Sequence, residues 1–240
     1  MNDGARRRKL AHAKTAKKPL TCVIRRLRRA IPRCGWVLIS APATWCRWLS
    51  TVTDSRSRCV LTGADVVRDG IVWDFFGAVT IVRRHLDTLE QQLGSRFTHA
   101  ATSFPPGTDP RISINVLESA GLEVSHVLDE PTAVADLLQL DNAGVVDIGG
   151  GTTGIAIVKQ GKVTYSADEA TGGHHISLTL AGNRRIELEE AEQVKRSNAQ
   201  EIWPVVKPVY EKMAEIVARH IEGQEIADLW LAGGSCMQPA

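Results

Sequence analysis

The sequence predicts an α/β fold, because segments with the pattern of strands alternate with segments that have the spacing of amphipathic helices. The clearest helix covers residues 77–93, where apolar residues recur every three or four positions with charged residues opposite. The clearest buried strand covers residues 145–148 and runs directly into three glycines. A hairpin formed by residues 154–158 and 162–166 adds antiparallel pairing to the middle of the fold.

The remaining elements follow from the same patterns and from glycine and proline. Pro110 in the first turn and Gly121 after the last turn bound a helix at residues 110–120. The other expected elements are strands at residues 100–104, 124–128 and 228–232 and helices at residues 131–140, 187–198 and 204–222.

The charges are unevenly distributed along the 240 residues, although their formal sum is only +2. Residues 1–60 carry 15 basic and 2 acidic side chains, a balance of +13, and residues 61–240 carry 14 basic and 25 acidic ones, a balance of −11. Four of the five cysteines also lie in residues 1–60, and no Cys-x-x-Cys pair indicates structural zinc. This division predicts two parts of different character.

The compartment can be inferred from what the sequence lacks. No apolar run approaches the ~18–20 residues that a membrane span requires, which argues against an integral membrane protein. The start at Met1 does not resemble a signal peptide, because no apolar segment follows its basic residues. We therefore expect a cytoplasmic protein.

Residues 1–33 are rich in Arg and Lys, and three interpretations compete for them. Such charge could bind nucleic-acid phosphates, belong to an organelle transit peptide, or lie in a disordered or non-native extension. We favour the third and do not expect nucleic-acid binding. The expected organisation is a basic, disordered or aberrant segment at residues 1–63 and a single nucleotide-binding domain at residues 64–240.

The sharpest chemical signal is residues 145–153, which read Val-Val-Asp-Ile-Gly-Gly-Gly-Thr-Thr. The strand brings Asp147 to its carboxyl end, and the glycines allow a tight turn that a ligand can approach closely. Consecutive backbone N–H groups in such a turn converge on an anion such as phosphate. The threonine hydroxyls add donors, and Asp147 can hold a hydrated Mg²⁺ that bridges the phosphates. A glycine turn of purely structural use is the alternative.

This segment resembles the second phosphate loop of the actin, sugar-kinase and heat-shock-chaperone ATPase superfamily. Residues 129–135 resemble the first connecting segment of the seventy-kilodalton chaperones, and residues 67–75 resemble a segment of the bacterial rod-shape actin homologue. Residues 231–235, Leu-Ala-Gly-Gly-Ser, look like the adenosine loop. Residues 64–240 are similar throughout to the EutJ family of ethanolamine utilization proteins. The resemblance implies a two-lobed, actin-like (ribonuclease H-like) fold.

The resemblance also implies a site for ATP or ADP with Mg²⁺. Asp147 would orient the metal through water, and Glu130 would lie near the attacking water or the metal, unless it only stabilises a helix N-terminus. Glu192 and Lys195 would hold the nucleoside, unless they form only an exposed ion pair. The β- and γ-phosphates would be cradled by Gly149, Gly150, Gly151, Thr152 and Thr153, and the adenosine would face Gly233 and Gly234.

One expected part is missing from the sequence. The superfamily holds phosphate between two hairpins, and the first, an Asp-x-Gly-Thr-like turn, is absent before Gly70. The codons compatible with residues 34–49 can encode Asp-Leu-Gly-Thr in the next register. We therefore hypothesise that residues up to about 63 are translated out of frame, which sequencing the gene would test. The carboxyl end also looks short of a helix and a strand, so we expect a fold that is incomplete at both ends and weak or absent ATP turnover.

The resemblance implies an ATP-binding, chaperone-like accessory protein of ethanolamine catabolism. Its protein client would be the ethanolamine ammonia-lyase, which it would help to assemble or reactivate, or proteins of the bacterial microcompartment with which it would associate. The alternative is a non-hydrolysing actin-like scaffold or a filament-forming protein. A sugar or acid kinase ranks last, because the sequence offers no identifiable acidic base for a substrate hydroxyl.

Overall fold

The computed structural model describes residues 13–15, 36–40, 48–52, 57–61, 66–68 and 71–237. The chain divides into two compact units, one made of residues 1–16 and 138–240 and the other of residues 17–137. Most of the segment 1–63, which we expected to be disordered or aberrant, lies outside the described residues. Four short strands are the described part of it.

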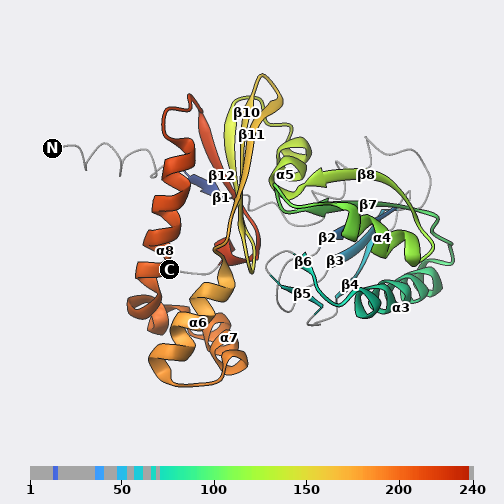
Figure 1. The fold of residues 1–240 in the computed structure, drawn as a ribbon, viewed down its shortest axis with the longest axis horizontal. Coiled ribbons are helices and arrows are strands. Elements are labelled where there is room, and N and C mark those ends of the chain that lie inside the picture. The colour runs from blue at the N-terminus through green and yellow to red at the C-terminus, as the bar shows by residue number, and fades with distance from the viewer. Residues whose placement is uncertain are drawn as a thin grey trace. The chain divides into compact units, whose positions relative to one another are not determined.

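The 17–137 unit contains a five-stranded sheet with the strand order β4-β3-β2-β7-β8 (Figure 1). Strands β2, β3 and β4 form an antiparallel meander, and β7 and β8 then extend the sheet in parallel from β2. A separate antiparallel ribbon pairs β5 with β6. The bounds are β2 Trp36–Ser40, β3 Trp48–Val52, β4 Ser57–Leu61, β5 Val67–Arg68, β6 Ile71–Val72, β7 His99–Phe104 and β8 Glu123–Asp129.

The described residues of this part of the chain form the helices α3 (Phe75–Leu93), α4 (Arg111–Ser119) and α5 (Glu130–Leu138). The carboxylate of Asp74 caps α3 by accepting a 2.9 Å hydrogen bond from the N–H of Gly77. Gly94, in the left-handed region with φ of 63°, ends the helix. The apolar face of α3 packs with α4 residues into one core, in which Leu89 and Leu117 are almost completely buried.

The unit that contains residues 138–240 has a second five-stranded sheet, with the order β1-β12-β9-β10-β11. Strands β9, β10 and β11 form an antiparallel meander, and β12 and β1 extend the sheet in parallel from β9. The bounds are β1 Ala13–Thr15, β9 Ala143–Ile148, β10 Thr153–Lys159, β11 Lys162–Glu169 and β12 Asp228–Ala232.

The two sheets therefore repeat one topology, in which β9 and β10 take the places of β2 and β3. The glycine-rich turn at residues 149–152 then corresponds to the β2–β3 connection at residues 41–47. Strands β2 and β3 lie where we expected the first phosphate hairpin, and their connection lies outside the described residues.

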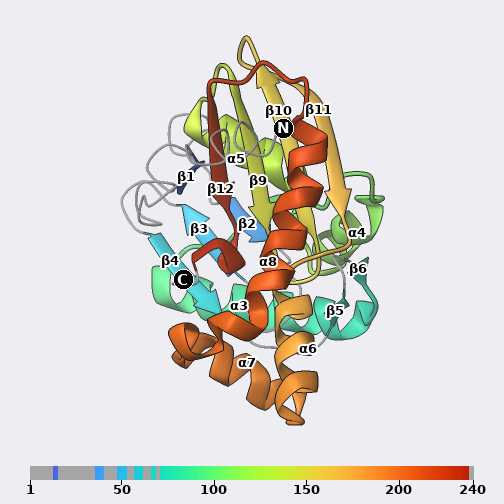
Figure 2. The same cartoon turned by 90° about the vertical axis from the view of Figure 1, so that its left-hand side faces the viewer.

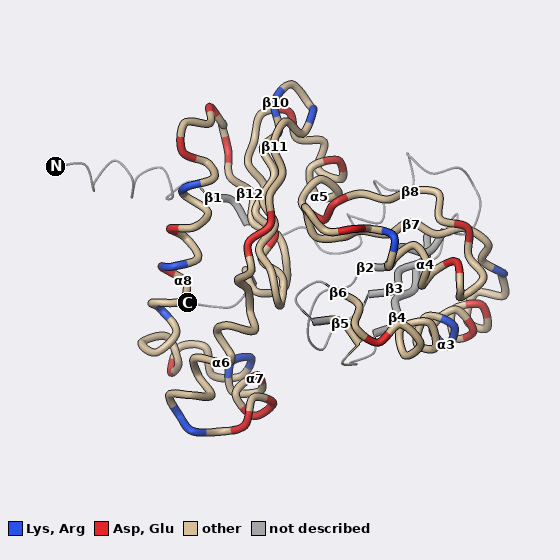
Figure 3. Tube along the Cα trace, viewed as in Figure 1, with Lys and Arg blue, Asp and Glu red and all other residues tan. Residues whose placement is uncertain are grey.

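Helices α6 (Gly173–Arg184), α7 (Leu188–Ser197) and α8 (Ala199–Ile221) complete this unit, together with the short 3₁₀ helix η1 (Gly234–Met237). The first half of α8 packs on α6 and α7 through Ile202, which is fully buried. The second half covers one face of the sheet, where Val217 contacts a cluster formed with Ile155 (Figure 2). Acidic and basic residues are interspersed along the described length of α8 (Figure 3).

The predicted alternation of helices and strands is confirmed from residue 75 onward, where two differences concern the α-helices. Helix α6 has no counterpart among the expected elements. Helix α8 begins at Ala199 rather than at residue 204, because the carbonyl of Asn198 accepts from the N–H groups of Glu201 and Ile202 and starts the helix earlier. Pro204, expected in the first turn, is thus inside the helix. No helix in the described part of the chain combines the length and apolarity needed to cross a bilayer.

Candidate functional site

Asp147 lies near the carboxyl end of β9, a strand that is paired on both sides. Its Cα lies opposite Gly154 of β10 and opposite Ala232 of β12. The strand before it is buried, with Val145 and Val146 almost inaccessible. The sheet therefore fixes the backbone at Asp147, near the end of a buried strand where the sequence places it.

The turn that follows is closed by a hydrogen bond of 2.9 Å from the N–H of Gly149 to the carbonyl of Thr152. The next residue, Thr153, is fully buried, and its hydroxyl donates to the carbonyl of Thr171 at 2.7 Å. That hydroxyl therefore anchors the turn within the fold.

The carbonyl groups of the turn are occupied by neighbouring donors. Gly149 accepts from the N–H of Gly173 at 3.0 Å, and Gly150 accepts from the N–H of His174 at 2.7 Å. Ser235 adds a second donor to the Gly149 carbonyl at 2.9 Å. The first turn of α6 and η1 thus hold these carbonyls in place, which fixes the orientation of the intervening peptide groups.

The N–H groups of the same turn are in a different situation. Among the described residues, no acceptor is found for the N–H of Gly150, Gly151 or Thr152. Three consecutive N–H groups, on a turn where the carbonyls of Gly149, Gly150 and Thr152 are already bonded, form a candidate nest for phosphate oxygens. The sequence predicts a phosphate cradle at these residues, and phosphate binding there stays a prediction.

The glycines of the turn are not required for left-handed backbone, and the tightest backbone approach at this turn is made by Gly172. No glycine of residues 149–151 has a positive φ. A Cβ on Gly172 would lie 2.6 Å from the carbonyl oxygen of Gly150 and 2.9 Å from that of Gly149. Close backbone contact between the turn and α6 therefore explains glycine on the α6 side.

Two carboxylates with raised pKa values lie near this turn. Burial and the nearby charge of Asp168 raise the pKa of Asp147 to about 6. Burial also raises the pKa of Asp168 to about 6, against the effect of a hydrogen bond from the Thr152 side chain. One oxygen of Asp168, Oδ1, is buried with no partner among the described residues. Among the described residues, no positive charge offsets either carboxylate.

The donor set around the turn suits one kind of metal ion. Within the described ranges, no group of three or more His, Cys, Asp or Glu side chains is placed to hold one. Mg²⁺ characteristically keeps several waters and binds through one or two carboxylates and substrate phosphates. Asp147, an uncompensated carboxylate beside a phosphate-type nest, fits such a cation.

The β12–η1 connection approaches Asp147 more closely than any side chain would allow. Gly233 has a φ of 87°, and a Cβ built on it would lie 2.5 Å from Oδ1 of Asp147. Gly234 is exposed and has no other atom within 4 Å of such a Cβ. The connection predicted to face adenosine is therefore adjacent to the carboxylate predicted to orient the metal.

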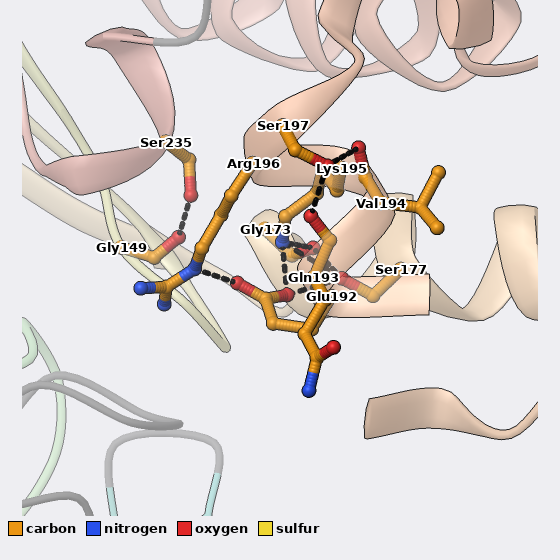
Figure 4. A network of polar contacts seen from close by, with 10 residues as sticks. All are labelled: Gly149, Gly173, Ser177, Glu192, Gln193, Val194, Lys195, Arg196, Ser197 and Ser235. Carbon is orange, nitrogen blue, oxygen red and sulfur yellow. Dashed lines mark hydrogen bonds and ion pairs between the residues drawn. The ribbon is translucent and has the colours of Figure 1, made fainter. Parts of the chain in front are cut away.

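Glu192 and Lys195 form the centre of a polar network between α6 and α7 (Figure 4). The Lys195 ammonium donates to the carbonyl of Gly173 at 2.9 Å, to Oγ of Ser177 at 2.7 Å and to Glu192. The side chains of Lys195 and Glu192 are only 9% and 16% exposed. The alternative interpretation of an exposed ion pair is therefore wrong.

The network also sets the charge states of its members. Burial lowers the pKa of Lys195, and the hydrogen bond from Lys195 to Glu192 opposes that effect. Burial alone would raise the pKa of Glu192, but hydrogen bonds from Lys195 and Ser177 outweigh it and hold the pKa below its ordinary value. The exposed Arg196 also donates to Glu192, at 2.9 Å. Lys195 of α7 thus contacts Gly173, whose N–H donates to the glycine-rich turn.

The predicted residues are not all in one unit. The structure gathers Asp147, the 149–153 segment and Gly233, and the Ser235 and Gly173 contacts join η1 and the Lys195 network to them. Glu130 belongs to the 17–137 unit, where it is the first residue of α5. Its catalytic role stays a prediction.

Several residues of the site were not predicted from the sequence, namely Asp168, Gly172, Gly173, Ser177 and Ser235. Ser235 could have been found, because it belongs to the same Gly-Gly-Ser run as the predicted Gly233 and Gly234. The Gly-Gly pair at residues 172–173 could have indicated close backbone approach. Nothing in the local sequence marks Asp168.

The sequence profile of the cell division protein FtsA family matches residues 144–239, which include the glycine-rich turn, α6 to α8 and β12. The solved structure of MreB5 of Spiroplasma citri bound to ADP has a TM-score of 0.67 at 15% identity, covering 84% of this chain and 85% of that chain. This likeness confirms the expected actin-like fold.

Closer relatives extend over most of the chain. The crystal structure of the ethanolamine utilization protein EutJ from Carboxydothermus hydrogenoformans has a TM-score of 0.80 and 37% identity, covering 92% of this chain and 88% of that chain. The ethanolamine utilization protein EutJ of Salmonella typhimurium is 89% identical over 197 residues, which are 81% of this chain and 71% of that protein. This chain belongs to the EutJ family of ethanolamine utilization proteins.

Proposed function

We propose that this chain is a nucleotide-binding accessory protein of ethanolamine utilization and that it binds ADP or ATP with Mg²⁺ at the glycine-rich turn. The observation that carries the proposal is the set of three N–H groups, on Gly150, Gly151 and Thr152, for which the described residues offer no acceptor. MreB5 of Spiroplasma citri, which shares the fold, was solved bound to ADP. The relatives at high identity are ethanolamine utilization proteins, and they supply the link to that process.

Each part of the nucleotide has a proposed position within the 138–240 unit. The N–H nest binds phosphate oxygens, and Asp147 holds Mg²⁺ through water so that the phosphate charge is neutralised. Gly233 and Gly234 face the adenosine, for which Glu192 supplies an acceptor. Lys195 acts by positioning Glu192, because its own ammonium is engaged with Gly173, Ser177 and Glu192.

We propose that ATP turnover by this chain is weak. Strands β2 and β3 occupy the places in their sheet that β9 and β10, which flank the glycine-rich turn, occupy in the other. Residues 34–49, which include the β2–β3 connection, contain no Asp or Glu and only one glycine. A phosphoryl transfer depends on electrostatic stabilisation and on a positioned water, and this segment supplies no carboxylate for either.

The client is proposed to be the ethanolamine ammonia-lyase or a protein of its microcompartment, which the chain would help to assemble or reactivate. The support is the family membership together with the chaperone-like connecting segment at residues 129–135. In this proposal Glu130, within that segment, keeps the role that the family resemblance implies, near the attacking water or the metal.

Isothermal titration of ADP with Mg²⁺ tests the binding proposal. Gly172→Ala places a Cβ 2.6 Å from the Gly150 carbonyl and should weaken binding at least about tenfold by displacing the turn. The matched control is Gly182→Ala, within α6, the helix that Gly172 precedes. A Cβ at Gly182 meets nothing within 4 Å, and alanine favours helix. No binding by the parent chain, or equal binding by both variants, would refute the proposal.

Two further measurements separate the alternatives. Substantial Mg²⁺-dependent ATP hydrolysis that Asp147→Ala abolishes would contradict weak turnover. Light scattering that rises on addition of ATP would identify the filament-forming alternative, whereas an unchanged signal is expected for an accessory protein that handles a client.

A further inference from the structure

A tyrosine, a histidine and a glutamate form a chain of two short hydrogen bonds outside the nucleotide site. Oη of Tyr165 lies 2.6 Å from Nδ1 of His220, and Nε2 of His220 lies 2.7 Å from Oε1 of Glu169. Tyr165 and Glu169 belong to β11, and His220 lies in the last turn of α8. The ring centres of Tyr165 and His220 are 5.9 Å apart.

The hydrogen-bond partners determine which nitrogen of the neutral histidine carries the proton. A carboxylate only accepts, so Nε2 of His220 carries the hydrogen that Glu169 receives. Nδ1 then has a lone pair and accepts from the hydroxyl of Tyr165. A hydroxyl, an imidazole base and an orienting carboxylate in this order are the elements of an activated oxygen nucleophile.

The group is separate from the glycine-rich turn. Side chains alternate along a strand, so Tyr165 and Glu169, four residues apart, lie on one face of β11 and Asp168 lies on the other. That first face is the one from which α8 contributes His220. Tyr165 is 37% exposed and the side chain of His220 is 17% exposed. A reagent can therefore reach the hydroxyl while the base is sheltered.

We propose that Tyr165 is a nucleophilic tyrosine that accepts an acyl group, with His220 as its general base and Glu169 as the positioning residue. The phenol oxygen attacks the acyl carbon, and its proton passes to Nδ1 of His220. The bond from the acyl carbon to the donor's leaving group breaks, and the leaving group takes its electron pair and then a proton from the imidazolium. The product is an O-acyl tyrosine, with no change in oxidation state.

The charge of the group favours an acyl donor over a phosphoryl donor. Glu169 places a negative charge within the hydrogen-bonded chain, and it stabilises the imidazolium that forms during the attack. The same charge repels an anionic phosphoryl group, whereas a neutral acyl group is not repelled. Acylation also removes the hydroxyl hydrogen, and with it one of the two hydrogen bonds that join β11 to the end of α8.

N-Acetylimidazole at pH 7.5 is the probe, and mass spectrometry of the peptides resolves the two sites of reaction. The chain contains only two tyrosines, so Tyr210 is an internal control. Burial and the nearby Cys236 raise the pKa of Tyr210 to about 12, and it should react slowly. Tyr165 should be acetylated at least about tenfold faster than Tyr210.

The variants test the roles of the other two residues. His220→Gln and Glu169→Gln should each slow acetylation of Tyr165 at least about fivefold. The matched control is His99→Gln. His99 also has a glutamate nearby, since its Nε2 lies 3.6 Å from Oε2 of Glu123. That substitution should leave the rate unchanged. Equal rates for Tyr165 in all three variants would overturn the proposal.

A comparison that needs no variant covers the case in which a substitution prevents folding. The parent chain is acetylated folded and again after unfolding in urea, where Tyr165 is fully exposed and has lost His220. An activated tyrosine reacts faster in the folded chain, and this is the expected result. Faster reaction after unfolding would show that Tyr165 is only accessible, and would overturn the proposal.

Discussion

Gly233 approaches Asp147 so closely that a Cβ on the glycine would lie 2.5 Å from the carboxylate oxygen Oδ1. The same Cβ would lie 2.3 Å from the carbonyl oxygen of Ile148. The parallel pairing of β12 with β9, with Ala232 opposite Asp147, brings the two segments together. The proposed adenosine and metal positions are thus coupled through backbone contact.

Gly233→Ala should therefore destabilise the fold by about 2 kcal/mol, because the new methyl group clashes and φ of 87° strains an L-residue. ADP binding should weaken together with stability. Gly234→Ala is the control for stability, since its Cβ meets nothing within 4 Å, and its effect on the unfolding free energy should stay within about 0.5 kcal/mol. Urea unfolding and calorimetry measure both. Equal stability of the two variants would contradict the close approach.

Lys195→Met should cost about 3 kcal/mol of unfolding free energy, because it leaves the half-buried Glu192 without its main partner. Adding Glu192→Met should restore much of that loss, and the double-mutant cycle should report a strong coupling. Lys207→Met is the control, because Lys207 pairs with Glu211 at 3.6 Å on an exposed helix face and should cost no more than about 0.5 kcal/mol. Additive effects of the first two substitutions would argue against the network.

The two raised carboxyl pKa values predict that stability falls as pH rises from about 4 to 6. The folded state binds the protons of Asp147 and Asp168 more tightly than the unfolded state, so their protonated forms favour folding, and this contribution is lost as pH passes through about 6. The lowered pKa of Glu192 acts at lower pH and does not offset this effect. Urea unfolding at several pH values gives the unfolding free energy as a function of pH. This free energy should fall less steeply between pH 4 and 6 for Asp147→Asn than for the parent chain. An unchanged slope would show that Asp147 does not titrate in this range.

Arg185→Gly should raise the unfolding free energy by about 0.5–1 kcal/mol, because Arg185 follows α6 in the left-handed region with φ of 56°, where glycine is favoured. The control is Arg184→Gly within the helix. It should destabilise by about 1 kcal/mol, because it loses helix propensity and the hydrogen bond to Glu201. Thermal unfolding followed by circular dichroism shows whether each variant is more or less stable than the parent chain.

The elements that could be predicted are those that their own residues specify. Gly94 ends α3, and Gln160 and Gly161 both have positive φ, of 52° and 70°, as a tight hairpin turn requires. Strand β12 begins and ends at the predicted residues, 228 and 232. In each case a local pattern and a stop signal agree.

The parts that could not be predicted depend on contacts distant in sequence. Helix α6 begins after Gly172, which is a poor helix signal, and its first N–H groups are fixed by the carbonyls of the glycine-rich turn. Asp168 reaches the site because β11 pairs with β10 and places it opposite Gly154. The burial of Lys195 likewise depends on the packing of α7 against α6. Periodicity along the chain contains none of this information.

The central claim is that the N–H groups of Gly150, Gly151 and Thr152 bind the phosphates of a nucleotide. The most direct measurement is a titration of the ¹⁵N-labelled chain with ADP and Mg²⁺, followed by amide NMR. We predict that the largest shifts fall on these three N–H groups, and that pyrophosphate reproduces them while adenosine alone does not. Binding of ADP that leaves these three amides unshifted would contradict the account.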